Sequence, residues 1–498
     1  MTCSSGPSPT APTARTRSST ATSRPTPSTR CAEPPGPGPL PRRFPAPPGT
    51  PQRPLALSNV PWHSPTPSIS PTPPAAAQAT AGDITSDGLC GCASLLLRDD
   101  QRMTDTPSAT PGDTPTLVPA DAVLSDAVPA DAVPTAGLKE RRFAALRRCD
   151  RFFSGARPQN LRERLAGLTT DAEAAYDLDE SPDHYGDGVV RALEQRVAGL
   201  LGMPDAAFFP TGTMAQQVAL RCWSSEHRTV AMHPLSHPEQ HERRAYSRLT
   251  GLQSVWPTTA PRLPTAQEVR DIEEDYDVLM LELPLREAGF VLPTWDELTA
   301  TVAAAREAGR AVHLDGARLW ESVYHLGHSL SEIAELADSV YISFYKTLGG
   351  ISGAALAGDV HTVREARIWR HRYGGQLFQQ WPAALSALAG LDRELPRLEA
   401  YVDHAKVAAE VLAALPGARV NPEPPHTHQF QLWLPYPADV LDEANLRLAD
   451  EQGIGLFGRW TEPGLPGLSY TEVTIAAAAL EWTPKEITEA ASSFLALL

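Results

Sequence analysis

A lysine and an aspartate each follow a short apolar run, and together they could serve one cofactor. Lys346 comes directly after the β-branched and aromatic run 339–345, and a Thr-Leu-Gly-Gly turn follows it. Asp315 ends the apolar run 311–314. A lysine amine can form a Schiff base with pyridoxal phosphate, and a carboxylate can keep the ring nitrogen of that cofactor protonated. Two ordinary surface charges at strand ends would give the same spacing. Other motifs in the chain are therefore needed to distinguish a cofactor site from this alternative.

The segments around these two residues alternate between strand and helix patterns. The continuous apolar run 278–281 predicts a strand that is covered on both faces. Thr294 and Glu297 have the spacing of a capping box, and we expect the helix that they begin to stop at Gly309. Strand–helix–strand alternation predicts an α/β fold with a mostly parallel sheet. Ligands bind at the carboxyl ends of such strands, where Asp315 and Lys346 are both expected.

The chain divides into three parts by composition and periodicity. An apolar helix face over 189–201, ended by Gly202, and a buried strand over 206–209 belong to the alternating region. After about Trp381 the pattern becomes a long helical stretch over 382–415, a strand over 429–434, and helices over 438–452 and 484–497. We expect a disordered Pro/Ser/Thr/Ala-rich tail at 1–137, a cofactor-binding large domain at 138–384 and a small C-terminal α+β domain at 385–498.

Composition excludes several classes of function. The net charge of −16 argues against a nucleic-acid partner. No run approaches the roughly 18 to 20 apolar residues of a membrane span. Outside the tail only Cys149 and Cys222 remain, which indicates a reduced, cytoplasmic protein. The N-terminus lacks a secretory signal and only loosely resembles a transit peptide. A start at Met103 is our preferred explanation for the tail, and whether 1–102 is translated stays open.

Three further motifs could belong to a cofactor site, and each has an ordinary alternative. The turn 210–213 opens a helix and could bind a phosphate, or it could be a simple N-cap. His237 could stack on an aromatic ring, whereas a zinc site there is disfavoured because Pro238 breaks any aligning helix. Arg318 could reach a phenolic oxygen, or it could pair with Glu321 at the surface.

Together these pieces resemble the PLP-dependent threonine aldolase and aromatic amino acid β-eliminating lyase family, which has the aspartate-aminotransferase-like fold type I. The resemblance runs from about Tyr185 to about Trp381 and is weaker beyond. The matching segments, in chain order, are Tyr185-Gly186-Asp187, Phe209-Pro210-Thr211-Gly212-Thr213, Ser236-His237, His313-Leu314-Asp315-Gly316-Ala317-Arg318 and Ser343-Phe344-Tyr345-Lys346. Five ordered matches make coincidence an unsatisfactory explanation.

The resemblance implies roles for individual residues. Lys346 would hold pyridoxal 5'-phosphate and act as a base, and Asp315 would keep the ring nitrogen protonated. His237 would stack on the ring. Gly212 and Thr213 would bind the phosphate, and Arg318 would lie near the phenolic oxygen. The implied activity is that of a lyase on a β-substituted amino acid, by carbon–carbon cleavage to glycine plus an aldehyde or by β-elimination. A small-molecule amino-acid substrate and a homodimer or homotetramer are expected, with no metal.

The chain departs from the family around the substrate. Aldolases usually read Glu-Asn-Thr-His-Asn after the central strand, whereas segment 282–289 here contains no histidine. Phe378 replaces an arginine, and the late arginine that would bind the substrate carboxylate has no clear match in 470–475. Arg459 and Arg286 are candidates for that contact, with Tyr185 as a further substrate residue. A racemase, an aminotransferase or a catalytically inactive relative are the alternatives.

Overall fold

The computed structural model describes residues 136–498, and their side chains from residue 139 onward. The predicted tail at 1–137 lies outside the described residues except for its last two. Among residues 136–498, no helix is both long and apolar enough to cross a membrane.

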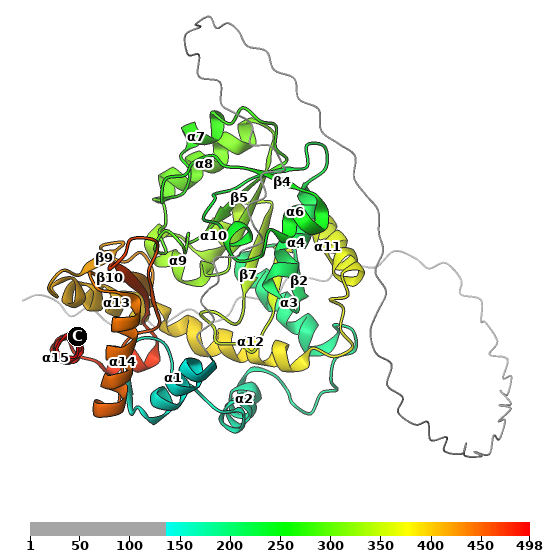
Figure 1. Ribbon diagram of the computed structural model, residues 1–498. Coiled ribbons are helices and arrows are strands. Elements are labelled where there is room, and N and C mark those ends of the chain that lie inside the picture. Colours follow the sequence, from blue (N-terminus) through cyan, green and yellow to red (C-terminus); the bar gives the residue numbers. More distant parts are fainter. Residues whose placement is uncertain (1–135) are drawn as a thin grey trace, which may run out of the picture. The chain divides into compact units, whose positions relative to one another are not determined.

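A twisted sheet forms the centre of the described part (Figure 1). Its seven strands, in spatial order, are β2 (Asp205–Phe209), β8 (Ala354–Gly358), β7 (Ser339–Ser343), β6 (Ala311–Gly316), β5 (Val278–Glu282), β3 (Thr229–Ala231) and β4 (Gln253–Val255). Strand β8 runs antiparallel to both of its neighbours, and the other pairs are parallel. The predicted α/β fold with a mostly parallel sheet is therefore confirmed. The register pairs Glu282, the last residue of β5, with Asp315 near the end of β6, and Asp315 with Tyr341 of β7.

Helices cover both faces of the sheet, which explains why the central strands are buried along their whole length. The helices of this part are α3 (Gly188–Leu201), α4 (Gly212–Trp223), α5 (His237–Gln240), α6 (Ala245–Thr250), α7 (Ala266–Arg270), α8 (Trp295–Glu307), α9 (Leu319–Leu326), α10 (Leu330–Glu335) and α11 (Val360–Arg372). Successive strand residues face opposite layers: Phe209 packs in a cluster with residues of α4 and α11, whereas Phe208 packs in the main core with residues of α3.

Local sequence signals set the helix ends as predicted. Thr294 accepts a hydrogen bond from the backbone N–H of Glu297, and the Glu297 carboxylate accepts one from the backbone N–H of Thr294, which completes the capping box of α8. Gly309, just beyond the end of α8, has a φ of +70°, a conformation that glycine adopts without strain. Gly202 ends α3 in the same region of φ, at +64°.

The C-terminal part combines an antiparallel sheet with helices. The sheet contains β12 (Trp460–Thr461), β13 (Ser469–Thr474), β10 (Gln429–Leu434) and β9 (Arg419–Asn421), in that order. The other elements are α12 (Trp381–Glu394), the 3-10 helix η1 (Leu395–Arg397), α13 (Leu398–Ala413), α14 (Ala438–Gln452), β11 (Ile454–Gly455), η2 (Ala477–Glu481) and α15 (Pro484–Leu495). The single helical stretch predicted over 382–415 is thus divided at η1. Pro396 accounts for the division, because proline has no N–H to continue a helix.

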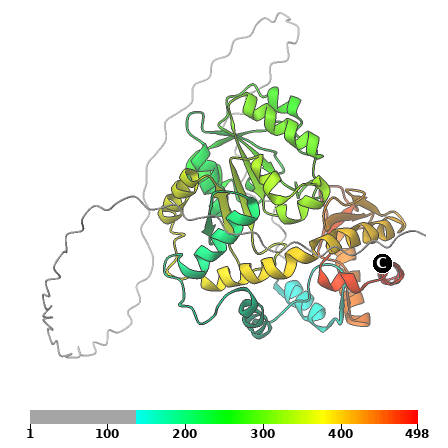
Figure 2. The same cartoon turned by 180° about the vertical axis from the view of Figure 1, so that it is seen from behind.

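The first described segments pack against the end of the chain. Helix α1 (Ala136–Arg148) contacts α14, β1 (Arg151–Phe152) pairs in parallel with β11, and α2 (Leu161–Ala175) contacts α12. Figure 2 shows α12, in yellow, running between the sheet and the orange C-terminal elements. The predicted boundary at 138 assigns α1 and β1 to the large domain, whereas their contacts are with the C-terminal part. The division into domains otherwise stays a prediction.

Candidate active site

Lys346 lies on the loop after β7, as its position in the sequence predicted. Burial of the amine, together with the nearby positive charge of Arg318, lowers the pKa of Lys346 to about 8. The carboxylates of Asp315 and Glu282 act in the opposite direction. A lysine with a lowered pKa keeps a larger fraction of uncharged amine near neutral pH, and the uncharged amine is the form that attacks a carbonyl carbon.

Asp315 ends β6 next to this lysine, and its side chain is buried. Its Oδ1 accepts a hydrogen bond of 3.1 Å from the backbone N–H of Ala317. Burial raises the pKa of Asp315, while the charges of Lys346 and His237 oppose that rise. A buried carboxylate of this kind is stabilised by a cationic partner, such as a protonated ring nitrogen.

A second buried carboxylate, Glu282, lies beside Asp315, and sequence reasoning did not assign it to the site. Glu282 Oε2 accepts a 2.8 Å hydrogen bond from the backbone N–H of His237, and Oε1 accepts one of 3.3 Å from the N–H of Arg286. Burial and the neighbouring charge of Asp315 raise the pKa of Glu282 to about 8. The signal for this residue was present, because a glutamate that ends a buried strand is unusual.

His237 begins the short helix α5 and is held by acidic side chains. Its Nδ1 lies 3.2 Å from Glu242 Oε1, and Gln217 Nε2 donates to Glu242 Oε2 at 3.0 Å. His237 lies close enough to Asp315 to oppose the rise in the pKa of that carboxyl group. The structure therefore brings His237 and Asp315 into one neighbourhood, as the sequence predicted.

The start of α4 has the form of an anion site. Thr211 is the N-cap residue and accepts a 3.2 Å hydrogen bond from the N–H of Met214, whereas Gly212 and Thr213 are the first helical residues. A Cβ atom at Gly212 would lie 2.3 Å from the Tyr341 hydroxyl, so only glycine fits beside this ring. Helix N-termini offer unpaired N–H groups and a positive dipole end, which favour phosphate.

Arg318 is the remaining predicted cofactor residue and lies in the wall of a cavity. Burial lowers its pKa, and among the described residues its Nε atom has no hydrogen-bond partner. The guanidinium carbon lies 5.3 Å from the centre of the Phe290 ring. A buried cation with an unpaired donor favours an anionic or oxygen-rich ligand.

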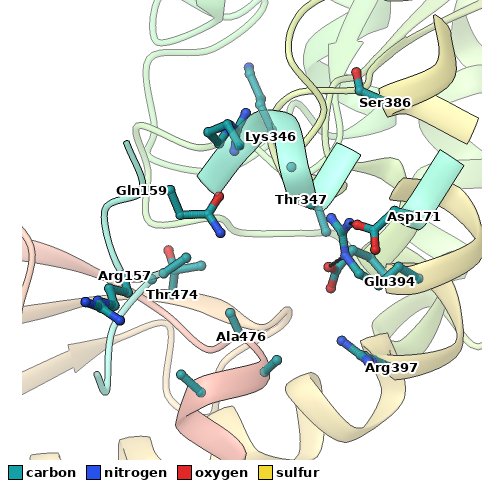
Figure 3. Close-up of a pocket in the computed structure, with 18 of the residues that line it drawn as sticks. Arg157, Gln159, Asp171, Lys346, Thr347, Ser386, Glu394, Arg397, Thr474 and Ala476 are labelled. Atoms are coloured by element: carbon teal, nitrogen blue, oxygen red, sulfur yellow. Dashed lines mark hydrogen bonds and ion pairs between the residues drawn. The ribbon is translucent and has the colours of Figure 1, made fainter. Parts of the chain in front are cut away.

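The cavity has a volume of about 1200 Å³ and contains Lys346, Thr347 and Arg318 in its wall. Figure 3 shows Lys346 and Thr347 around the same space as Gln159, Thr474 and Ala476. Residues from the segment before α3 and from the C-terminal part therefore meet the lysine in one space.

The three predicted substrate residues are placed differently. Arg286 lies near Lys346, because its charge contributes to the lowered pKa of that lysine. Arg459 is exposed and acts electrostatically on Arg142 and Asp442, at the side of the small sheet. Tyr185 is 56% exposed, with its ring edge-on to Phe378 at 5.5 Å.

Pyridoxal phosphate fits this arrangement of donors and acceptors. Lys346 offers an amine and Asp315 a buried carboxylate, while the unpaired Arg318 Nε and the glycine at the start of α4 suit the oxygen atoms of the cofactor. The residue types and their burial are those that a cationic ring with a phosphate arm requires.

Known proteins match both the sequence and the structure. The model of the beta-eliminating lyase family matches residues 161–433. A low specificity L-threonine aldolase from Escherichia coli strain K12 is 30% identical over 237 residues, which cover 46% of this chain and 71% of that protein. The crystal structure of a candidate L-allo-threonine aldolase from Listeria monocytogenes EGD-E is 35% identical and has a TM-score of 0.67, covering 73% of this chain and 100% of that chain. A candidate aromatic amino acid beta-eliminating lyase/threonine aldolase from Exiguobacterium sp. 255-15 is 37% identical, with a TM-score of 0.66 and coverage of 72% and 100%.

Proposed function

The chain belongs to the beta-eliminating lyase family and is a pyridoxal-phosphate-dependent lyase, and we propose that it cleaves the Cα–Cβ bond of a β-hydroxy-α-amino acid. Products would be glycine and an aldehyde. The observation that supports this best is the buried Lys346 amine, which lies in one cavity wall with Arg318 and whose pKa is influenced by the charges of Arg318 and Asp315. The names of the relatives from Escherichia coli and Listeria monocytogenes favour aldol cleavage over β-elimination for this site.

The residues of the site would hold the cofactor at both ends. The first N–H groups of α4, at Gly212 and Thr213, would bind the phosphate, and the Asp315 carboxylate would keep a proton on the ring nitrogen. Bound pyridoxal phosphate supplies a carbonyl carbon for the amine and a protonated ring that withdraws electrons. Lys346 would hold the cofactor covalently and, once released by the substrate amine, move the proton at the α carbon. His237 would lie against the ring, held there by Glu242.

The substrate carboxylate needs a cation, and Arg318 suits this contact better than the two arginines predicted from the sequence. Among residues 136–498 the Nε atoms of Arg318 and Arg286 both lack a hydrogen-bond partner, but Arg318 lies in the wall of the cavity that contains Lys346. Arg286 already has two acidic partners, with Nη1 2.7 Å from Glu287 and Nη2 2.8 Å from Glu472. We therefore assign the carboxylate contact to Arg318, with Arg286 as the second candidate.

The proposal includes an assembly of at least two copies in the cytoplasm. Both described cysteines, Cys149 and Cys222, are free thiols, which agrees with a reducing compartment. Tyr185 and Phe378 form an exposed aromatic contact, and His184 stacks on Phe378 at 5.2 Å. Exposed aromatic groups of this kind favour a protein partner, and a second copy of this chain would bring Tyr185 to a site.

Product analysis tests the proposed reaction. The purified protein with its cofactor is given L-threonine, L-allo-threonine and β-phenylserine, and in parallel L-serine and L-tyrosine. We expect glycine and the matching aldehyde from at least one β-hydroxy amino acid. Keto acid with ammonia as the main product would identify β-elimination instead, and an exchange of stereochemistry without cleavage would identify a racemase.

A further inference from the structure

A partly exposed histidine–glutamate pair, His241 and Glu287, lies beside His237, and no role has been assigned to it so far. We call this position the open edge. His241 follows α5, one helical turn after His237, and the two rings are 5.3 Å apart. His241 Nε2 lies 2.7 Å from Glu287 Oε1. Because Glu287 is 46 positions further along the chain, this pair is made by the fold rather than by neighbours in sequence.

Arg286 ties this pair to the lysine. Its Nη1 donates to Glu287 Oε1 at 2.7 Å, and its Nη2 donates to Glu472 at 2.8 Å. Its backbone N–H binds Glu282, whose register partner is Asp315. The charge of Arg286 also lowers the pKa of Lys346. His241 and Glu287 therefore belong to a chain of charges that reaches the reacting amine.

The hydrogen bonds determine which nitrogen of His241 is available as a base. The Glu287 carboxylate only accepts, so the 2.7 Å bond places the proton of a neutral imidazole on Nε2. Arg286 Nη1 also lies near Nε2, but at the longer distance of 3.3 Å. Nδ1 then keeps its lone pair. The His241 side chain is 36% exposed, so a proton that it takes up can pass to solvent.

We propose that His241, held by Glu287, is the base that takes the proton from the β-hydroxyl group of the substrate. This assignment rests on the proposed aldol cleavage. The O–H bond breaks and its proton goes to Nδ1, while the electron pair of that bond forms the C=O bond of the aldehyde. The Cα–Cβ bond breaks and its electron pair stays on the α carbon, which takes up a proton to give glycine. The proton on Nδ1 is then lost to water.

Two measurements on one variant test this assignment. His241→Gln keeps a donor for Glu287 but has no base. We expect the rate of aldehyde formation to fall about 100-fold, the lower range for a general base. Exchange of the α hydrogens of glycine in D2O should stay within about two-fold, since that reaction has no β-oxygen. The matched control is His328→Gln, because His328 also pairs with a glutamate, Glu332 at 3.4 Å, and lies just before α10 with its side chain 31% exposed. Both rates should be unchanged in it.

The outcomes separate this assignment from the reaction itself. Aldehyde formation by His241→Gln within three-fold of the unmutated protein overturns the assignment, and so does an equal loss of both rates. If the unmutated protein exchanges glycine but releases no aldehyde from any β-hydroxy amino acid, the proposed reaction is wrong, and the assignment is wrong with it.

Nitrogen NMR of labelled histidine gives a readout that does not depend on turnover. In the unmutated protein the neutral imidazole of His241 should carry its proton on Nε2. In Glu287→Gln, which can donate to that nitrogen, the Nδ1–H form should gain population. A neutral imidazole with its proton on Nδ1 in the unmutated protein would overturn the assignment.

Discussion

Besides His237 and Glu242, two further histidine–glutamate pairs are linked to the segment around Lys346, and they differ in burial and in what they connect. His241 and Glu287 are 36% and 20% exposed and lie 2.7 Å apart. His428 and Glu321 are 3% and 0% exposed, and His428 Nε2 lies 3.5 Å from Glu321 Oε1. The first pair stands at the open edge beside α5, whereas the second joins α9 to the segment before β10.

The buried pair is arranged to hold structure in place. Glu321 Oε1 accepts a 2.8 Å hydrogen bond from Thr347, the residue after Lys346. His428 Nδ1 lies 2.7 Å from the carbonyl oxygen of Ile475 and donates to it. Through these two hydrogen bonds, the buried residues connect the loop after Lys346 with the end of β13. The open pair can exchange protons with water. Both pairs have the same residue types, so solvent exposure is what suits the first pair, and not the second, to the proposed role as a base.

The largest expected effect comes from Lys346. In Lys346→Ala both aldehyde formation and glycine exchange should fall by at least about 10³-fold, because the proton at the α carbon has lost its carrier. His241→Gln should affect only the first of these rates. Borohydride reduction of the unmutated protein followed by peptide mapping should place the cofactor on Lys346. A cofactor found on another lysine would refute the central assignment of the site.

The next prediction compares how much each pair contributes to the free energy of unfolding. Glu321→Ala should lower the free energy of unfolding by roughly 2 kcal/mol, because it leaves the Thr347 hydroxyl without its acceptor and removes a fully buried side chain. Glu287→Ala should lower it by only about 1 kcal/mol or less, since that pair is partly solvated. Urea unfolding of the two variants in parallel provides the measurement. Equal losses would show that both pairs serve stability and would remove the distinction between them.

The sequence was sufficient to place Lys346 and Asp315 near the ends of neighbouring strands, and their roles stay predictions. Lys346 and Asp315 end strands whose apolar runs are readable, and parallel strands bring their carboxyl ends to one edge. The capping box at Thr294 is likewise a local signal. These features can be predicted from local sequence patterns and from the geometry of a parallel sheet.

The contacts between distant segments could not be predicted in the same way. The pairing of β1 with β11 joins residues that are about three hundred positions apart, and no local pattern marks it. The pair of His241 and Glu287 depends on the turn after β5, where Leu285 bridges to Val291 and Phe290 has a φ of 62°. The position of Arg459 depends on how β12 packs. Such contacts depend on the fold as a whole, and local patterns in a single sequence do not predict them.

A pH dependence of the free energy of unfolding is expected at Glu282, the register partner of Asp315. The pKa of Glu282 is raised from 4.5 to about 8 by burial and by Asp315. A carboxyl group with a raised pKa binds its proton more tightly in the folded state, so between these values folding retains a proton that the unfolded chain releases. Stability from this group is therefore complete below about pH 4.5 and is lost as the pH rises to about 8.

The cofactor-free protein should lose stability over this range, and Glu282→Gln should show a flatter curve of unfolding free energy against pH. Guanidinium unfolding at several pH values, with Glu287→Gln at the open edge as the control, measures the slope. Parallel curves for Glu282→Gln and the unmutated protein would mean that Glu282 is charged in the folded state, and Asp315 would then share its edge with a second full negative charge.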